Sequence, residues 1–154
     1  MDKENTLYID LKDGRVIIAM RPDLAPTHVA QIKKLAREGK YDGVVFHRVI
    51  DGFMAQTGDP TGTGSGGMGE TLKSEFSKEP HVRGAVSMAR TSDPHSARSQ
   101  FFICFKDSNF LDGQYTVWGK VTSGMEHVDK IKKGEPPSNP DKMIKVQVAA
   151  DAKD

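Results

Sequence analysis

The chain begins with two short segments in which apolar residues occupy every second position, the spacing of strands that bury one face. The alternating positions are Leu7, Ile9 and Leu11 in the first segment and Val16, Ile18 and Met20 in the second. Asp13-Gly14 lies between them and favours a two-residue turn, because both central residues of such a turn take positive φ values. The pattern predicts a β-hairpin in which Leu11 pairs with Val16, Ile9 with Ile18 and Leu7 with Met20.

Two later segments have the apolar spacing of amphipathic helices. The first runs over residues 26–38: Pro26 suits the first helical position, and Gly39 is placed to end the helix. Its apolar stripe consists of Val29, Ile32, Leu35 and Ala36. A shorter helix is predicted over residues 125–132, bordered by Gly124 and Gly134.

Six further segments are short, rich in β-branched or aromatic residues, and bounded by Gly, Pro, Asp or Ser, which is typical of strands. They are residues 44–49, 53–56, 86–90, 101–105, 116–121 and 143–148, the last with Ile144, Val146 and Val148 on one face. The total is about eight strands and two helices. Because many strands follow one another without an intervening helix, the pattern favours an antiparallel sheet that is closed or nearly closed.

Composition narrows the class of protein. A length of 154 residues corresponds to a single domain. Lys and Arg total 22 against 21 Asp and Glu, a net charge of +1, which argues against nucleic acid or an anionic membrane as partner. No apolar run predicts a transmembrane helix or a signal peptide. The one cysteine, Cys104, cannot form an intramolecular disulfide, and together these features predict a cytoplasmic protein.

Glycine and proline cluster in residues 57–69, where Gly62 to Gly67 match the spacing G-x-G-x-x-G. A dinucleotide site requires a strand before this motif and a helix at its end, so that helical N–H groups face the pyrophosphate. Neither flank has that character, and an irregular surface loop is the better interpretation. Nucleotide binding therefore remains only the weakest of the alternatives.

Other catalytic chemistries have little support in the sequence. The five histidines never fall at i, i+4 on a predicted helix, and a single cysteine cannot build a thiolate site, so no metal is expected. Cys104 lies within the apolar residues 101–105 and is interpreted as a small buried side chain rather than a nucleophile. No G-x-S-x-G motif is present, so nothing indicates a hydrolase.

Arg48 is the unusual residue, because it lies in a predicted strand on the same face as Phe46 and Ile50. The ordinary interpretation is an arginine paired with a carboxylate. The functional interpretation rests on Phe53, Met54 and Gln56, which are suited to an apolar pocket with an amide at its edge. A guanidinium beside such a pocket is a permanently charged cluster of donors, suited to electrostatic chemistry on an uncharged substrate.

Five separated motifs, in order, resemble those of the cyclophilins, and in particular the small bacterial members. They are FHRVIDGFMAQ (46–56, followed by Gly58-Asp59), GAVSMA (84–89), SQFFI (99–103), FLDG (110–113) and VWGKV (117–121). The resemblance covers residues 6–148, nearly the whole chain. It implies a mainly β fold, a closed eight-stranded antiparallel β-barrel capped by two α-helices, and peptidyl-prolyl cis-trans isomerase (rotamase) activity without a covalent intermediate or cofactor.

The resemblance also implies roles for particular residues. Arg48 matches the catalytic arginine of the family, and His47 beside it is expected to be supportive. The positions matched to substrate binding are Phe53, Met54, Gln56, Ala89, Arg90, Gln100, Phe102, Phe110, Leu111 and Tyr115. Three of them depart from the commonest pattern: Phe110 replaces Trp, Tyr115 replaces His, and Arg90 replaces Asn. The first two keep an aromatic wall, but the lost indole predicts weaker binding of cyclosporin A.

The expected substrates are proline-containing peptides and unfolded or folding proteins, acted on by a cytoplasmic monomer. A second hypothesis is a proline-motif binding module or folding helper, whose isomerase activity is incidental. The two differ in whether function depends on Arg48, because binding alone does not require stabilisation of a twisted amide.

Overall fold

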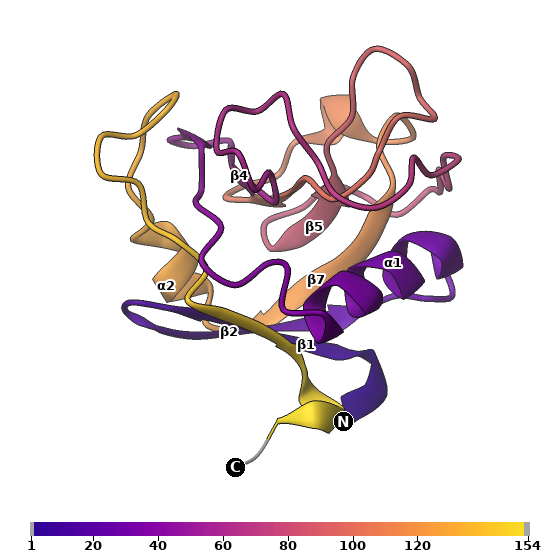
Figure 1. Cartoon of the computed structure of the whole chain (residues 1–154). Helices are drawn as coiled ribbons and strands as arrows, with labels where there is room; N and C mark the ends of the chain where they lie inside the picture. The colour runs from indigo at the N-terminus through magenta and orange to yellow at the C-terminus, as the bar shows by residue number, and fades with distance from the viewer. Residues whose placement is uncertain (1, 153–154) are drawn as a thin grey trace.

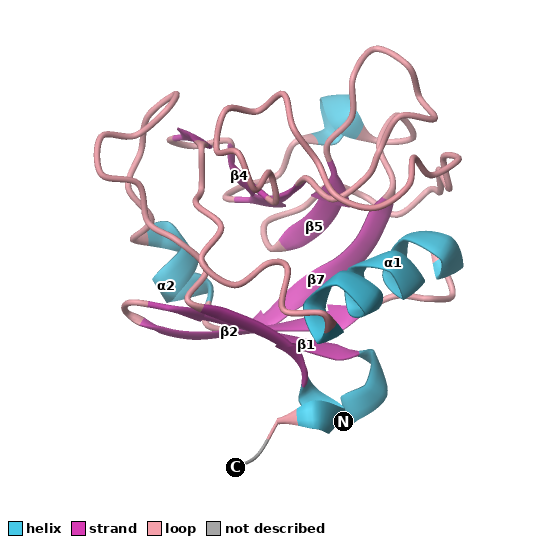
Figure 2. Cartoon of the chain, in the orientation of Figure 1, coloured by secondary structure: helices cyan, strands magenta, loops and turns pink. Residues whose placement is uncertain are grey.

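Eight strands form one antiparallel sheet in the computed structural model, which describes residues 2–152. The strands are β1 (Thr6–Leu11), β2 (Gly14–Met20), β3 (Arg48–Ile50), β4 (Met54–Thr57), β5 (Ala85–Met88), β6 (Phe101–Cys104), β7 (Val117–Ser123) and β8 (Lys145–Val148). Their order across the sheet is β3-β4-β6-β5-β7-β2-β1-β8. The sheet is strongly curled, and many of its loops gather at the end away from the two termini (Figures 1 and 2). No helix within residues 2–152 has the length and apolar character needed to span a bilayer.

The expected mainly antiparallel architecture is confirmed, but a closed barrel is not. The edge strands β3 and β8 do not pair with each other. The residues before them meet instead, through an isolated bridge between Val45 and Lys142 and single backbone bonds such as Phe46 N–H to Asp141 O at 2.8 Å. The segment leading to β8 contains three prolines in residues 135–141, and proline cannot donate to a ladder, so continuous pairing stops there.

The hairpin is present, but its predicted register is wrong by two residues. Leu11 pairs with Gly14 and Ile9 with Val16, so the turn is made by Lys12-Asp13 instead of Asp13-Gly14. A shift of two leaves every side chain on its predicted face, because the side-chain period of a strand is two. The apolar pattern therefore could not distinguish the two registers.

The two helices, α1 (Pro26–Arg37) and α2 (Met125–Asp129), pack against β8 and β2 respectively. In α1 the predicted stripe of Val29, Ile32, Leu35 and Ala36 is buried. The second helix is shorter than expected, although Ile131 beyond its end is still buried.

Two strand predictions extended too far toward the N-terminus. Residues 44–47 precede β3 and form no continuous ladder, but only the isolated bridge at Val45 and single backbone hydrogen bonds. Phe46 is buried in the main core, while Arg48 is exposed. The two side chains therefore do not share a strand face. Ile144, expected beside Val146 and Val148, lies before β8 and is half exposed.

The short strand β6 buries both of its faces and thereby divides the interior in two. Phe101 and Ile103 point into the main core, where Phe101 packs edge-on against the fully buried Trp118 with ring centroids 5.3 Å apart. Phe102 and Cys104 point to the other face and join a second, smaller apolar cluster. A strand buried on both faces explains why residues 101–105 show no polar alternation.

Close backbone packing accounts for the glycine that directly precedes α2. Gly124 has φ +89°, a left-handed conformation, and a Cβ there would fall onto the carbonyl oxygen of Arg15 in β2. Gly43 has a similar φ of +80° but open space where its Cβ would be. Substituting Gly43 and Gly124 in turn therefore separates two free-energy costs, that of the left-handed conformation and that of the close backbone contact.

We expect Gly43→Ala to lower the free energy of unfolding by about 1 kcal/mol, the cost of a left-handed residue with a Cβ. Gly124→Ala should cost at least about 2 kcal/mol more, because the backbone of β2 must shift as well. Urea unfolding of both variants measures the difference. Equal losses would show that α2 does not rest on β2 as closely as described.

Candidate active site

The second apolar cluster lies where several strands and loops meet at one end of the sheet. Its buried members are Met54, Ala85, Phe102, Cys104 and Leu111, with Ile50, Phe53, Ala89 and Tyr115 packed against them. They come from β3, β4, β5, β6, the loops that flank these strands and the 3-10 turn Asn109–Leu111. The cluster does not close completely, and the remaining hollow forms a small pocket of about 130 Å³.

The pocket brings together residues that are far apart in the sequence. Its lining consists of Arg48, Phe53, Met54, Gln56, Ala89, Arg90, Phe102, Leu111 and Tyr115. Of the residues matched to substrate binding, only Gln100 and Phe110 are outside it. Phe110 is 69% exposed and packs against Phe53, with ring centroids 5.6 Å apart, so it extends the apolar wall beyond the pocket.

Strand register explains why Arg48 stands beside this pocket. Arg48 on β3 pairs with Gln56 on β4, Gln56 pairs with Phe102 on β6, and Phe102 pairs with Ser87 on β5. Directly paired residues carry their side chains on the same face of a sheet. This cross-strand row, Arg48–Gln56–Phe102–Ser87, therefore places a guanidinium, an amide and a phenyl ring side by side.

The Arg48 guanidinium is held by two neighbours. Its Nη1 donates to Gln56 Oε1 at 3.3 Å, and its Nε donates to Glu135 Oε1 at 3.2 Å. The side chain is 45% exposed and the Glu135 side chain 57% exposed, so this ion pair contributes little to stability. Both interpretations of Arg48 thus hold together: it is paired with a carboxylate, and it lines the apolar pocket.

Glu135 is the site residue that the sequence did not suggest. It is 87 positions from Arg48 in the chain and lies in the proline-rich loop after α2. Nothing in its local sequence, Gly134-Glu135-Pro136, distinguishes it from a solvent-exposed loop glutamate. With Arg48 and Gln56 it also lines a second, wider hollow of about 490 Å³.

Gln56 is oriented by a chain of amide hydrogen bonds. Gln100 Nε2 donates to the carbonyl oxygens of Gly64 and Gly66, at 2.9 and 2.7 Å. Its Oε1 is then free to accept from Gln56 Nε2 at 2.8 Å, which turns Gln56 Oε1 toward Arg48. Since each amide has one donor end and one acceptor end, the loop carbonyls determine which end faces the arginine. Gln100 thus acts on the pocket through Gln56.

The glycine-rich loop that anchors Gln100 folds around the buried carboxylate of Asp59. Gly64 and Gly66 donate their N–H groups to Oδ2 at 2.7 and 3.0 Å, and Thr61 donates both its N–H and its hydroxyl to Oδ1. Burial alone would raise the pKa of Asp59, but these hydrogen bonds outweigh it and lower the pKa to about 2. The amides that a phosphate would need are therefore engaged within the chain, which argues against nucleotide binding.

The remaining titratable groups near the pocket are not arranged for covalent chemistry. Burial raises the pKa of the Cys104 thiol to about 12, so it is not a thiolate at neutral pH. His47 is buried beside Arg48, and burial lowers its pKa. Within residues 2–152, no three His, Cys, Asp or Glu side chains are grouped to share a metal ion.

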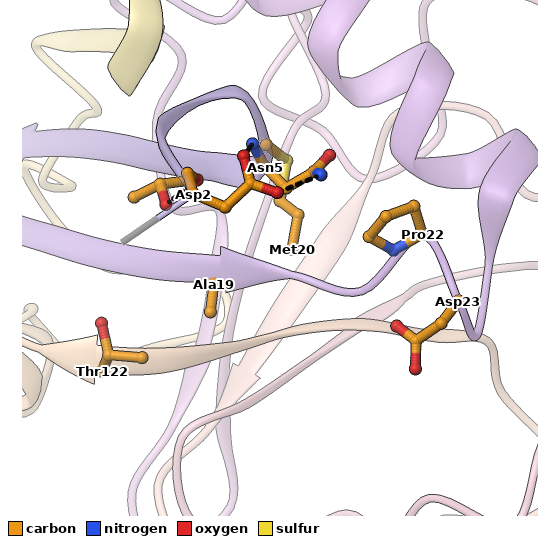
Figure 3. Close-up of a pocket in the computed structure, with 8 residues that line it drawn as sticks. Asp2, Asn5, Ala19, Met20, Pro22, Asp23 and Thr122 are labelled. Carbon is orange, nitrogen blue, oxygen red and sulfur yellow. Dashed lines mark hydrogen bonds between the residues drawn. The ribbon is translucent and has the colours of Figure 1, made fainter.

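A wider surface hollow, of about 600 Å³, lies elsewhere, between the N-terminal turn and the end of β2 (Figure 3). Its lining combines Asp2, Asn5, Asp23 and Thr122 with Ala19, Met20 and Pro22. It contains neither an aromatic nor a basic side chain. The smaller pocket beside Arg48 combines apolar walls with a few convergent polar groups, the arrangement typical of ligand sites.

Comparison with known proteins places these observations in a family. Residues 6–149 match the family model described as cyclophilin type peptidyl-prolyl cis-trans isomerase/CLD. A probable peptidyl-prolyl cis-trans isomerase of Brucella suis is 58% identical over 99% of this chain and 86% of its own length. Peptidyl-prolyl cis-trans isomerase B of Bacillus subtilis is 47% identical over 84% of this chain and 92% of its own length.

Solved structures agree with the sequence relatives. The crystal structure of a cyclophilin from Hirschia baltica superposes with a TM-score of 0.91 at 32% identity, covering 99% of this chain and 77% of that one. A cyclophilin-type isomerase from Cryptosporidium parvum, crystallised in the presence of the dipeptide Ala-Pro, superposes with a TM-score of 0.86 at 27% identity, covering 93% and 98%.

The depressed pKa of Asp59 predicts an acid-sensitive contribution to stability. A carboxyl group whose folded pKa is below its unfolded value stabilises the fold above the unfolded value, and the effect is lost as pH falls. The shift from 3.8 to about 2 corresponds to about 2 kcal/mol, present above about pH 5 and lost between about pH 4 and pH 2.

Urea unfolding of the wild type and of Asp59→Asn between pH 7 and pH 2.5 checks this prediction. The variant should be less stable at pH 7 and should lose less stability on acidification, because its amide does not titrate. Asp51→Asn serves as the control, since Asp51 is exposed in the β3–β4 turn and should keep the wild-type profile. Parallel profiles for Asp59→Asn and the wild type would contradict the assignment.

Proposed function

Because the chain belongs to the cyclophilin-type peptidyl-prolyl cis-trans isomerases, we propose that it catalyses rotation about X–Pro bonds in the pocket beside Arg48. The isomerase class follows from the family. The proposal concerns the residues that carry the reaction and how they do so. The observation that supports it most directly is the cross-strand row in which Arg48 and Gln56 adjoin the pocket-lining ring of Phe102.

The reaction demands a particular kind of catalyst. Rotation about a peptide bond has a barrier of about 18–20 kcal/mol, and for X–Pro the cis form is only about 0.5–1 kcal/mol above trans. No bond to the substrate has to form or break, so no nucleophile or cofactor is required. The catalyst must bind the twisted amide more tightly than either planar form.

Arg48 supplies the interaction that distinguishes the twisted amide. When the amide twists, the lone pair of the proline nitrogen leaves conjugation and becomes a hydrogen-bond acceptor. A guanidinium donor beside the pocket gains most in the twisted state, because the planar amide nitrogen accepts poorly. Gln56 and Glu135 engage Nη1 and Nε of Arg48, and no group within residues 2–152 bonds to Nη2, which is therefore available as the donor. They also limit the motion of the side chain.

The apolar walls hold the proline ring while the bond rotates. Phe53, Met54, Phe102, Leu111 and Tyr115 surround a space of about 130 Å³, small enough to suit a ring rather than a longer side chain. Ala89 and Arg90 follow β5 at the rim, where their backbone is suited to an extended peptide. The Ala-Pro dipeptide with which the Cryptosporidium parvum relative was crystallised supports proline-containing peptides as substrates. Unfolded and folding proteins are the corresponding physiological substrates.

The substitution Arg48→Ala should lower kcat/KM for a proline-containing peptide about 10²- to 10³-fold, the usual cost of removing one preorganised donor to a transition state. Arg37→Ala is the matched control, because Arg37 is also an exposed, ion-paired arginine, bonded to Glu4 and Asp151 away from the pocket. NMR exchange measurements on the peptide give the rate, and a titration gives its affinity.

The two measurements distinguish the candidate roles of the pocket. Catalysis through Arg48 requires a lower exchange rate with affinity changed only a few fold. If Arg48→Ala keeps both the wild-type exchange rate and the wild-type affinity, the proposed mechanism is wrong. Retained cell function in Arg48→Ala would favour the binding-module hypothesis over an isomerase role.

Cyclosporin A should bind weakly, because Phe110 offers an exposed phenyl ring and no N–H donor. Phe110→Trp should raise the affinity about tenfold, since one added hydrogen bond contributes about 1 kcal/mol and burial of the larger ring adds to it. Calorimetric titration of both proteins measures the change. An unchanged affinity would indicate that residue 110 does not contact the ligand.

A further inference from the structure

Behind the pocket, three polar side chains form a chain of hydrogen bonds that the proposed chemistry does not use. His81 Nδ1 lies 3.0 Å from Asp112 Oδ1, and His81 Nε2 lies 3.0 Å from Ser87 Oγ. Asp112 Oδ1 also accepts the backbone N–H of His81 at 2.7 Å. We refer to Asp112, His81 and Ser87 as the polar relay.

The chemistry of the three groups determines where the protons are. An ionised carboxylate only accepts, so Nδ1 of His81 carries a hydrogen and donates it to Asp112. In the neutral ring Nε2 is then an acceptor, and Ser87 Oγ donates to it. The hydrogen bonds from His81, first from its backbone N–H and also from its ring, lower the pKa of Asp112 and keep it ionised.

The order Asp–His–Ser matches that of hydrolytic triads, but the relay has no access to substrate. The Ser87 side chain lies on β5 with no solvent exposure, and the His81 ring is also buried. A nucleophile must reach the reacting carbon, so Ser87 cannot be one. The relay acts on its surroundings within the protein.

Those surroundings are the walls of the pocket. The His81 ring stacks on Phe102, with centroids 6.1 Å apart and planes 18° apart, and meets Tyr115 edge-on at 6.4 Å. Asp112 directly follows Leu111 and closes its 3-10 turn, and the carbonyl oxygen of His81 accepts the N–H of Ser108 at the start of that turn. One imidazole thus supports the Phe102, Leu111 and Tyr115 sides of the pocket.

We propose that His81 is a positioning residue, which through its bonds to Asp112 and Ser87 holds the Phe102, Leu111 and Tyr115 walls in the geometry that binds proline. The inference rests on the proposed function, because it concerns the same pocket. It assigns His81 to affinity for the proline ring, whereas Arg48 acts on the rotating bond.

The relay should make proline binding sensitive to acid. Protonation turns Nε2 into a donor, so the Ser87 hydroxyl must rotate and lose its buried acceptor. The ionisable groups in contact with the ring are Asp112 from the 3-10 turn and Tyr115, whose ring also has the Arg90 guanidinium 4.7 Å from its centroid. Cys104 from β6 belongs to the same apolar cluster as Phe102. Burial lowers the pKa of His81, and Asp112 only partly opposes this. The affinity should therefore fall only at pH values below the 6.5 of an unperturbed histidine.

The test compares Asp112→Asn with the wild type, using the dissociation constant of the capped peptide acetyl-Ala-Ala-Pro-Ala-amide between pH 4.5 and pH 8. The asparagine carbonyl can keep both hydrogen bonds from His81 while removing the charge that stabilises the imidazolium. The rise of the dissociation constant at low pH, which we call the acid limb, should then move to lower pH by about one unit.

The chain offers a matched control in Glu75→Gln. Glu75 accepts both the backbone N–H and the ring Nδ1 of the buried His28, the same arrangement as Asp112 with His81, but neither residue lines the pocket. Its acid limb should coincide with that of the wild type. His47 also titrates near Arg48, and because Asp112 has no bond to it, a shift in Asp112→Asn identifies His81.

Two results would overturn the proposal. The wild-type dissociation constant could stay constant across this pH range, or Asp112→Asn could weaken at the same low pH as the wild type. A second measurement needs no variant: in the wild type, the ring signals of His81 and Phe102 should titrate with one midpoint, and separate midpoints also overturn it. A wild type that binds the peptide but does not accelerate its isomerisation refutes the proposed function instead, so the two failures are distinguishable.

Discussion

The cross-strand row Arg48–Gln56–Phe102–Ser87 is the constraint on which the candidate site depends. Because the four residues are paired directly across four strands, their side chains lie on the same face of the sheet. The guanidinium, the amide and the ring are therefore neighbours. The row exists because β6 buries both faces: Phe101 and Ile103 hold the strand in the main core, while Phe102 is presented to the pocket. Packing on one face thereby stabilises the geometry of the other.

Two carboxylates, Asp59 and Asp112, fix the loops around this cross-strand row. Asp59 accepts hydrogen bonds from the glycine-rich loop and so fixes its conformation. Carbonyl groups of this loop orient Gln100, and Gln100 in turn orients Gln56. Asp112 ties the turn carrying Leu111 to His81. Each carboxylate accepts several N–H or O–H groups, and an ionised acceptor makes stronger hydrogen bonds than a neutral one. These hydrogen bonds stabilise the irregular segments on both sides of the pocket.

This arrangement is consistent with a reaction that needs shape and a fixed donor rather than reactive groups. Catalysis by preferential binding of a twisted amide requires that walls and donor keep their positions while the substrate moves. In the proposed scheme the walls and the donor are supported separately, by the polar relay behind Phe102 and by Gln56 and Glu135 at Arg48. In that scheme, loss of the relay affects mainly the affinity for proline, and loss of Arg48 affects mainly the rotation rate.

Several features were determined by the sequence alone, because they depend on local periodicity or on motifs. The hairpin, α1 and the apolar faces followed from side-chain spacing, and the motifs identified the family and nearly all of the pocket lining. Spacing could not decide the hairpin register, since a two-residue shift preserves every face. Other contacts join residues that are remote in the sequence: the ion pair of Glu135, the amide chain through Gln100 and the polar relay. Phe46 does not share a strand face with Arg48, because strand pairing begins only at β3. Only the tertiary structure decided these contacts, because a hydrogen bond between distant side chains leaves no periodic trace in the chain.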